Sequence, residues 1–342
     1  MACIAILWAT LFINEVAIAD PGNNCLLVPI DSPELSIDPS VLAALHKANM
    51  AREDFFKALR IVSRYETNGC WAGATGNFDG QLLSVGAMQW NFGRGSLQPL
   101  LKRFTEKFAS PSHFAQVRDN LMPSYGKQLF DISCRTIPIG KDCLSFLANL
   151  RQGENGNLKK AFKQEVDNLF NSEPMRQIQL DYFGRSVTSV LSDLDRVYGA
   201  SHPRGWQVAW AVDIKTQQGN KFPTDKNIQR IKSRTISEPL NNRVKYAGGV
   251  IKWYDGLCDS GLSDGIKYDC EYNIKTWPSL ISALLNETDR EEALHYTFLV
   301  SKTAANQNGA YQANAFQRRA TIVFGRGSVN GGKIDFTSPE TK

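Results

Sequence analysis

Three short segments stand at the centre of this chain: Tyr65-Glu66-Thr67-Asn68-Gly69-Cys70-Trp71, then Asn77-Phe78-Asp79-Gly80-Gln81, then Ser84-Val85-Gly86-Ala87-Met88-Gln89-Trp90-Asn91. The first places the carboxylate of Glu66 at the end of a predicted amphipathic helix, and the second places that of Asp79 in a glycine-rich segment beyond it. Two carboxylates in different environments differ in proton affinity, so one can act as an acid while the other acts as a base. We therefore expect the fold to be organised around residues 55–101.

The residues before Glu66 predict a helix that ends just after it. One face of this helix, at spacings of i, i+4, i+7 and i+11, carries Phe55, Leu59, Val62 and Glu66. The pair Asn68-Gly69 is typical of a helix stop, because both residues tolerate a left-handed backbone. Glu66 therefore prolongs an apolar stripe.

A carboxylate in this place is a candidate general acid. It loses solvation on the apolar face and meets the negative end of the helix dipole, and both effects raise its pKa. Glu66 is then expected to keep a proton near neutral pH, as a general acid must. The alternative is a Glu66 side chain that turns into solvent or pairs with Arg64.

Residues 71–96 are rich in glycine and show no helical period, so turns and short strands are expected there. Taken alone, Asp79 in this segment is typical of a residue that caps its own turn. Gln89 and Asn91 carry amides that can hydrogen-bond to sugar hydroxyls, and the ring of Trp90 between them can stack on a sugar ring. The alternative for Trp90 is packing in the core.

Most of the remaining chain has a helical period. Helices are expected at 39–66 with a break near 49–52, and at 98–108, 111–121, 127–133, 158–170, 174–199, 206–218, 224–234, 289–303 and 312–323. Loops or turns are expected at 134–143, 151–157, 235–245, 259–277 and 325–332, and short apolar segments at 250–258 and 278–285. The predicted fold class is mainly α, with a small β region near 71–90.

One predicted helix carries polar groups beside two tryptophans. Its shared face, again at i, i+4, i+7 and i+11, contains Trp206, Trp210, Asp213 and Gln217. Asp213 and Gln217 could line the far wall of a ligand groove. Alternatively, the face packs in the core and neighbouring groups satisfy Asp213.

The N-terminus has the pattern of an export signal. Residues 2–19 are almost wholly apolar and close with Val16-Ala17-Ile18-Ala19, whose small residues fit a cleavage site. A signal peptide over residues 1–19 is expected, and an N-terminal membrane anchor is the alternative. No later stretch approaches the roughly 20 apolar residues of a membrane-spanning helix, so stable membrane insertion is not expected.

Cysteine usage also indicates export, to the periplasm or the medium. After residues 1–19 an even set remains: Cys25, Cys70, Cys134, Cys143, Cys258 and Cys270. An even count in an exported chain favours disulfides. The two pairs close in sequence could each close a short loop, which leaves Cys25 for Cys70, although other pairings are formally possible. With only 4 His and no Cys-x-x-Cys, no zinc site or other cofactor is expected.

The chain is basic, with a formal charge of +5 that loss of Glu15 with the signal would raise further. A basic exported protein suits a polyanionic partner such as a bacterial cell wall. Nucleic acid is not the expected partner, because the basic residues form no run with interleaved aromatic residues.

The central segments resemble a known catalytic signature. A helix ending in Glu66, followed by Asp79-Gly80-Gln81-Leu82-Leu83-Ser84-Val85-Gly86, is similar to the signature of the chitosanase branch of the lysozyme superfamily. The block at 76–101 and the segments Asp213-Ile214-Lys215-Thr216-Gln217-Gln218-Gly219 and Arg318-Arg319-Ala320-Thr321-Ile322-Val323-Phe324-Gly325 resemble exported bacterial lysozyme-like proteins. The resemblance implies a two-lobed lysozyme-like fold, with one lobe at about 20–150 and the other at about 151–342.

The resemblance also implies roles for particular residues. Glu66 would be the general acid, Asp79 the base that activates water, and Ser84 a residue that helps hold that water. The reaction would invert the anomeric carbon. The expected substrate contacts are Tyr65, Gln81, Gln89, Trp90, Asn91, Asp213 and Gln217.

The sequence favours peptidoglycan over chitosan as the glycan. The chitosanase signature has an arginine where this chain has Gln81, and the separation between Glu66 and Asp79 is shorter here. A basic groove would also repel chitosan, which is a polycation. The prediction is an exported, monomeric glycoside hydrolase acting on cell-wall glycan, as a housekeeping enzyme or an antibacterial effector. The alternatives are a chitosanase and a catalytically silent wall-binding protein.

Overall fold

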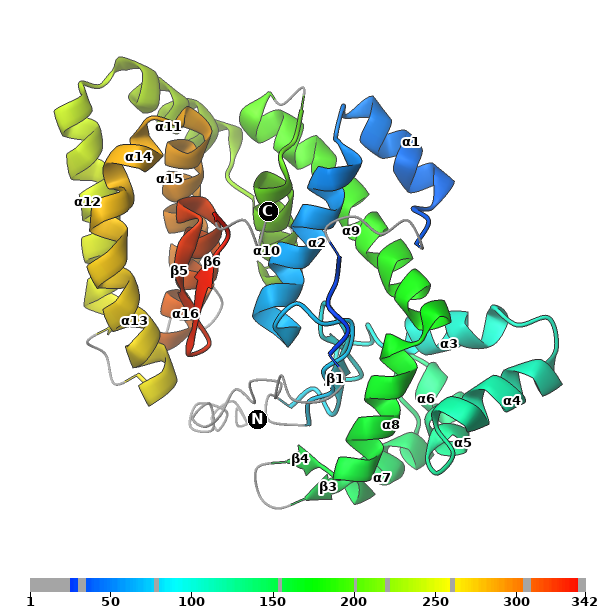
Figure 1. Ribbon diagram of the computed structural model, residues 1–342. Coiled ribbons are helices and arrows are strands. Elements are labelled where there is room, and N and C mark those ends of the chain that lie inside the picture. The colour runs from blue at the N-terminus through cyan, green and yellow to red at the C-terminus, as the bar shows by residue number, and fades with distance from the viewer. Residues whose placement is uncertain are drawn as a thin grey trace, which may run out of the picture. The chain divides into compact units, whose positions relative to one another are not determined.

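The computed structural model describes residues 25–29, 35–76, 80–152, 156–199, 202–218, 222–258, 262–303 and 309–337 (Figure 1). The predicted signal peptide, residues 1–19, lies outside these ranges, and so does Asp79.

The chain is mainly helical, which confirms the predicted class. The first helices are α1 (Pro39–Lys47), α2 (Arg52–Thr67), α3 (Gln98–Glu106), α4 (Pro111–Leu121), α5 (Gly126–Leu129), α6 (Ile132–Arg135), α7 (Lys141–Asn149), α8 (Lys160–Asn171) and α9 (Glu173–Tyr198). They are followed by α10 (Gly205–Gln218), α11 (Asp225–Ser237), α12 (Leu240–Cys258), α13 (Asp264–Thr276), the 3₁₀ turn η1 (Trp277–Leu280), α14 (Ile281–Leu285), α15 (Thr288–Lys302) and α16 (Gly309–Phe324).

The strands in the described ranges form three short antiparallel ladders. They are β1 (Ser84–Val85) with β2 (Trp90–Asn91), β3 (Arg151–Gln152) with β4 (Asn157–Leu158), and β5 (Arg326–Val329) with β6 (Gly332–Asp335). The first ladder lies in the β region predicted near 71–90, where Thr75 also pairs with Ser84.

The described residues form two compact units, and the chain passes between them three times. The first unit contains residues 25–41 and 62–185, and the second contains 42–61 and 186–337. Each passage lies inside a helix, namely α1, α2 and α9. The last of the three passages, from the first unit to the second, lies after Arg185 in α9.

The first unit is built around a core of apolar side chains from α3 to α9 and the segment 72–101. Phe130 lies at its aromatic centre, stacked on Phe104 at 5.4 Å and edge-on to Phe114 at 5.3 Å between ring centroids. Such contacts add to the free energy gained by removing these rings from water.

The second unit is centred on α10, which is buried on nearly every face. It packs against α16, and α16 in turn contacts α12, α13, α15 and the β5–β6 hairpin (Figure 1). A helix surrounded in this way has no polar face, which is why its amphipathic signal is weak.

Two predictions for the C-terminal part are wrong. Residues 240–258 form one helix, α12, whose buried face is made of Ala247, Val250, Ile251 and Tyr254. The expected loop at 259–277 likewise contains α13, which runs from Asp264 to Thr276. The adjacent glycines Gly248 and Gly249 lower helix propensity, but packing of the apolar face outweighs that local preference.

The predicted turn-rich close at 325–332 is instead the β5–β6 hairpin. Its turn is Asn330-Gly331, with φ of 57° and 77°. This dipeptide is typical of two-residue hairpin turns that need positive φ at both positions. The dipeptide Asn330-Gly331 therefore indicates a hairpin, which the prediction of a turn-rich close did not include.

The disulfide prediction is confirmed. Three bonds join Cys25 to Cys70, Cys134 to Cys143 and Cys258 to Cys270. Disulfides of this kind persist in oxidising compartments. Within the ranges described, none of the helices has the length and apolar character needed to cross a bilayer.

Candidate functional site

Glu66 lies on the last turn of α2, as the sequence predicts. The helix is ended by Asn68 and Gly69, which have φ of 57° and 88°, and the Gly69 N–H donates to the Ser63 carbonyl at 3.1 Å. Glu66 is half-buried, whereas its neighbours Tyr65 and Thr67 are buried. Of the residues Tyr65, Glu66 and Thr67, only Glu66 therefore remains partly open to solvent.

The segment that follows Glu66 is fastened to residues 25–29. The Cys25–Cys70 disulfide joins the two, and Leu27 pairs with Cys70 as an isolated β-bridge. The Val28 N–H donates to the Gly69 carbonyl at 2.7 Å, and the Trp71 N–H donates to the Leu26 carbonyl at 3.0 Å. The chain immediately after the candidate acid is thus fixed covalently and by backbone bonds.

The next feature is a closed loop. The Thr75 N–H donates to the Ser84 carbonyl at 2.8 Å, and the Ser84 N–H donates to the Thr75 carbonyl at 3.1 Å. The segment between them along the chain is 76–83, and its residues 77–79, which include Asp79, lie outside the described residues. Gly80 and Leu82 on its far side have φ of 76° and 71°. The base of this loop is therefore well defined.

Ser84 has 3% of its surface exposed and belongs to the β1–β2 ladder, where it is paired with Asn91. Both of its backbone groups are used in closing the loop. The structure thus gives Ser84 a structural part through its bonds to Thr75, and the water-holding role stays a prediction.

The amides of Gln89 and Asn91 hold their own loop. Gln89 donates from Nε2 to the Gly73 carbonyl at 2.9 Å and accepts from the Thr75 hydroxyl at 3.0 Å. Asn91 Oδ1 accepts the Arg94 N–H at 2.8 Å. These bonds explain why Gln89 tolerates a positive φ of 51°.

Trp90 and Tyr65 are 8% and 5% exposed and belong to the core. For Trp90 this is the packing that the sequence left open as an alternative to sugar stacking. Gln81 is half-buried at the loop margin, where its carbonyl accepts the N–H groups of Leu83 at 2.9 Å and Gly93 at 3.0 Å.

Two residues that the sequence did not single out hold this region in place. Asp167 on α8 accepts the N–H groups of Gly73 and Ala74 at 3.1 and 2.9 Å, and pairs with Lys163 at 2.6 Å. It lies 93 positions from Ala74. Asp167 is not part of the apolar pattern that predicts α8, so nothing in the nearby sequence could have indicated this contact.

The second is Gln179 on α9, which is fully buried. Its Oε1 accepts the Ala87 N–H at 3.0 Å, and its Nε2 donates to the Phe170 carbonyl at 3.0 Å. Gly86 packs so closely on this amide that a Cβ there would lie 2.8 Å from Oε1. A buried glutamine in an apolar helix face is the one sequence signal that could have drawn attention to it.

Asp213 belongs to the second unit and is 3% exposed. Its Oδ1 accepts from Arg319 Nε and its Oδ2 from Arg318 Nε, both at 2.9 Å. Arg319 also donates to Gln218 at 2.7 Å. Burial lowers the pKa of the Arg319 guanidinium, and the Asp213 carboxylate opposes that shift. These contacts agree with the alternative in which Asp213 packs in the core and neighbouring groups satisfy it. Gln217, one turn further along the same helix, is half-buried.

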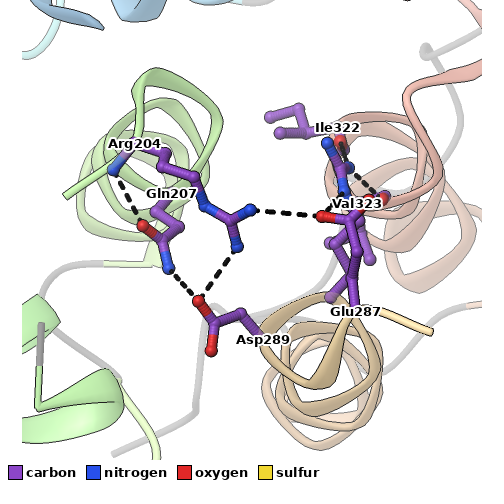
Figure 2. A network of polar contacts seen from close by, with 7 residues as sticks. Arg204, Gln207, Glu287, Asp289, Ile322 and Val323 are labelled. Atoms are coloured by element: carbon purple, nitrogen blue, oxygen red, sulfur yellow. Dashed lines mark hydrogen bonds and ion pairs between the residues drawn. The ribbon is translucent and has the colours of Figure 1, made fainter. Parts of the chain in front are cut away.

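Trp206 of the same helix lies in a polar network near the start of α10. Figure 2 shows the guanidinium of Arg204 directed toward Glu287 and Asp289, at 3.2 and 2.9 Å. The guanidiniums of Arg204 and Arg290 lie 5.1 and 4.7 Å from the Trp206 ring. This network links the start of α10 to the start of α15, so these side chains stabilise the fold of the second unit.

Comparisons of the chain with protein-family models, with curated proteins and with solved structures found no match. The resemblance to lysozyme-superfamily enzymes is therefore carried by the motif residues alone. Among the described residues, no group of three or more His, Cys, Asp or Glu side chains could hold a metal ion.

Proposed function

We propose that the chain is an exported glycoside hydrolase that cleaves bacterial cell-wall glycan, with Glu66 as the general acid. The observation that carries the proposal is the pair of hydrogen bonds between Thr75 and Ser84. They join the residues on either side of the segment 76–83, whose sequence contains Asp79 and which follows the half-buried Glu66 at the end of α2 along the chain. A glutamate at a helix end, followed closely in the sequence by an aspartate, supports a site with two carboxylates.

In the proposed reaction Glu66 donates a proton to the glycosidic oxygen as the bond to the leaving sugar breaks. Asp79 takes a proton from a water molecule that attacks the opposite face of the anomeric carbon, with inversion. Two carboxylates and water suffice for this chemistry. Ser84 contributes by fixing the loop base, and its hydroxyl is the candidate for orienting the water.

Two further observations support an exported enzyme with an anionic substrate. Three disulfides suit an oxidising compartment. The formal charge of +5 suits the anionic wall better than the polycation chitosan.

The test is release of reducing ends from purified peptidoglycan by the oxidised full chain. Mass analysis of the products from a defined muropeptide identifies the bond that is cut. Glu66→Gln is expected to lower the rate by about 10²–10⁴-fold, the range for loss of a general acid. Glu53→Gln is the matched control, because Glu53 is an exposed acid on the first turn of the same helix.

The alternatives give different results in the same assay. Release from chitosan but not from peptidoglycan would indicate a chitosanase. A third outcome is that the wild-type protein releases nothing from either glycan and still co-sediments with cell walls. That result would favour a catalytically silent wall-binding protein over an enzyme.

A further inference from the structure

The second unit contains a cavity that the proposed hydrolysis does not use. It lies among α11, α12 and α15 and has a volume of about 310 Å³. Ligand pockets of proteins begin at about 300 Å³, so this cavity has room for a small molecule. Its lining consists of Arg230, Ile231, Arg234, Lys245, Tyr246, Gly249, Val250, His295, Phe298 and Leu299.

The charged side chains of the lining are all basic. Arg230, Arg234 and Lys245 come from two helices, and in the described part of the chain none of the three forms an ion pair with an acid. The Arg234 guanidinium lies 4.1 Å from the centre of the Tyr246 ring, which fixes it over an aromatic face. Three uncompensated cations around one cavity attract an anion.

His295 supplies a buried polar group at the same cavity. It is 4% exposed, and its Nε2 makes no hydrogen bond within the described residues. The nearest carboxylate oxygen, Glu291 Oε1, is 4.0 Å away, and that carboxylate is already bonded by Arg243 at 2.9 and 3.1 Å. Burial, with a smaller effect of Arg234, lowers the pKa of His295 to about 4. The imidazole is therefore neutral and has hydrogen-bonding capacity to offer a ligand.

The rest of the lining is apolar. Val250 is buried, while Phe298 and Leu299 are half-buried. Tyr246, which also lines the cavity, is 38% exposed. A free inorganic ion would leave the exposed part of this apolar lining in water, whereas a ligand with an apolar body would cover it.

We propose that this cavity binds a small organic anion with one phosphate or carboxylate group on an apolar body. The anionic group is held by Arg230, Arg234 and Lys245, and His295 adds a neutral hydrogen-bonding partner. The body lies against Val250, Phe298 and Leu299. The proposal is independent of the hydrolase function, since it uses no residue of the first unit.

Four probes separate the parts of the proposal: hexyl phosphate, hexanoate, hexanol and inorganic phosphate, each titrated into the oxidised full chain by calorimetry. Hexyl phosphate or hexanoate is expected to bind, and whichever binds more tightly identifies the anionic group. Burying a methylene raises affinity up to about fourfold. Inorganic phosphate and hexanol are therefore each expected to bind at least about tenfold more weakly than the preferred organic anion.

The chain offers a matched pair of variants for the cavity. Gly249 lines it and Gly248 does not, and a Cβ added at either position meets no atom within 4 Å in the part of the chain that the structure describes. Both lie inside α12, so replacement of either glycine favours the helix. Gly249→Leu should fill the cavity and weaken binding by about tenfold or more, while Gly248→Leu should bind like the wild type.

A charge variant completes the test. Arg234→Gln should weaken binding of the preferred anion by about tenfold and leave the weak binding of hexanol unchanged. The proposal is overturned if neither hexyl phosphate nor hexanoate binds the wild type at millimolar concentration. It is also overturned if Gly249→Leu, with circular dichroism and melting temperature like those of the wild type, binds as well as Gly248→Leu.

Discussion

Asp167 Oδ1 accepts the backbone N–H of Ala74 at 2.9 Å, across 93 positions of sequence. The same oxygen accepts the N–H of Gly73 at 3.1 Å. Gly73 and Ala74 are buried, so loss of this acceptor would leave their N–H groups poorly placed to bond to water instead. One carboxylate on α8 thus fixes the backbone between Glu66 and the loop that contains position 79.

Removing this carboxylate should lower the stability of the fold. Asp167→Ala leaves two buried N–H groups without an acceptor, so we expect the free energy of unfolding to fall by about 2–3 kcal/mol. Asp167→Asn keeps an acceptor oxygen and should lose about 1 kcal/mol or less. Urea unfolding measures both changes. Lys163→Ala, which removes only the partly exposed ion-pair partner, is the control, and an equal loss in all three variants would contradict the assignment.

Alanine substitutions at Gly86 and Gly80 distinguish the stability cost of an unfavourable backbone conformation from the cost of a steric clash. Gly86 and Gly80 have φ of 87° and 76°, so alanine pays a similar conformational cost of about 1–2 kcal/mol at either position. A Cβ at Gly86 would lie 2.8 Å from Gln179 Oε1 and 2.9 Å from atoms of Phe170 and Trp90. A Cβ at Gly80 would meet no atom of the described residues within 4 Å.

Gly86→Ala should therefore lose about 1–3 kcal/mol more than Gly80→Ala. The comparison is made by urea unfolding of the two variants beside the wild type. Equal losses would mean that the Gln179 amide moves away at no cost.

The helical class and most helix positions could be predicted because the evidence for them is local. The N-cap at Asp38 is an example: its Oδ1 accepts the Ser40 N–H at 2.8 Å, and α1 begins at Pro39 as expected. The stop at Asn68-Gly69 is another. Disulfide pairing was also accessible, because the close cysteine pairs left Cys25 and Cys70 for each other.

The buried ion pair of the second unit gives a third prediction. Asp213 and Arg319 have side chains 2% and 0% exposed, so Asp213→Asn leaves buried guanidinium charge without its counter-ion. The expected loss is about 3–5 kcal/mol in urea unfolding. Glu106→Gln is the control, since its pair with Lys102 spans 3.9 Å between groups 48% and 65% exposed. That variant should change stability by about 0.5 kcal/mol or less.

A fourth prediction concerns acid. His295 has a pKa of about 4 in the folded chain against an ordinary 6.5, so unfolding takes up a proton between these two values. Stability from this group is full above pH 6.5 and is lost as the pH falls toward 4, by up to about 3 kcal/mol.

The measurement is urea unfolding of the wild type and His295→Gln at pH 4 and pH 7. Asp269 and Glu292, whose pKa burial raises, act in the opposite direction as the pH falls, so the difference between the two proteins is the informative quantity. The wild type should lose more stability than the variant. Identical losses would show that His295 is protonated in the folded chain.

The long-range part of the candidate site could not be predicted. The contacts from Asp167 and Gln179 depend on how α8 and α9 pack, and no periodicity carries that information. The same holds for Asp213, because a face with two tryptophans and one acid looks alike whether it lines a groove or meets Arg318 and Arg319. Amides such as Gln89 are equally ambiguous, since a sugar hydroxyl and a backbone carbonyl present similar partners.

The three passages of the chain through α1, α2 and α9 have a consequence for any attempt to divide the protein. Residues 42–61 belong to the second unit although they precede most of the first, so a chain cut after Arg185 would carry the fully buried rings of Phe55 and Phe56 without their surroundings. Simple truncation therefore yields neither unit intact. A circular permutant that brings 42–61 next to 186 in sequence is the rational route to an isolated second unit. During synthesis, likewise, that unit can be completed only after the first has been made.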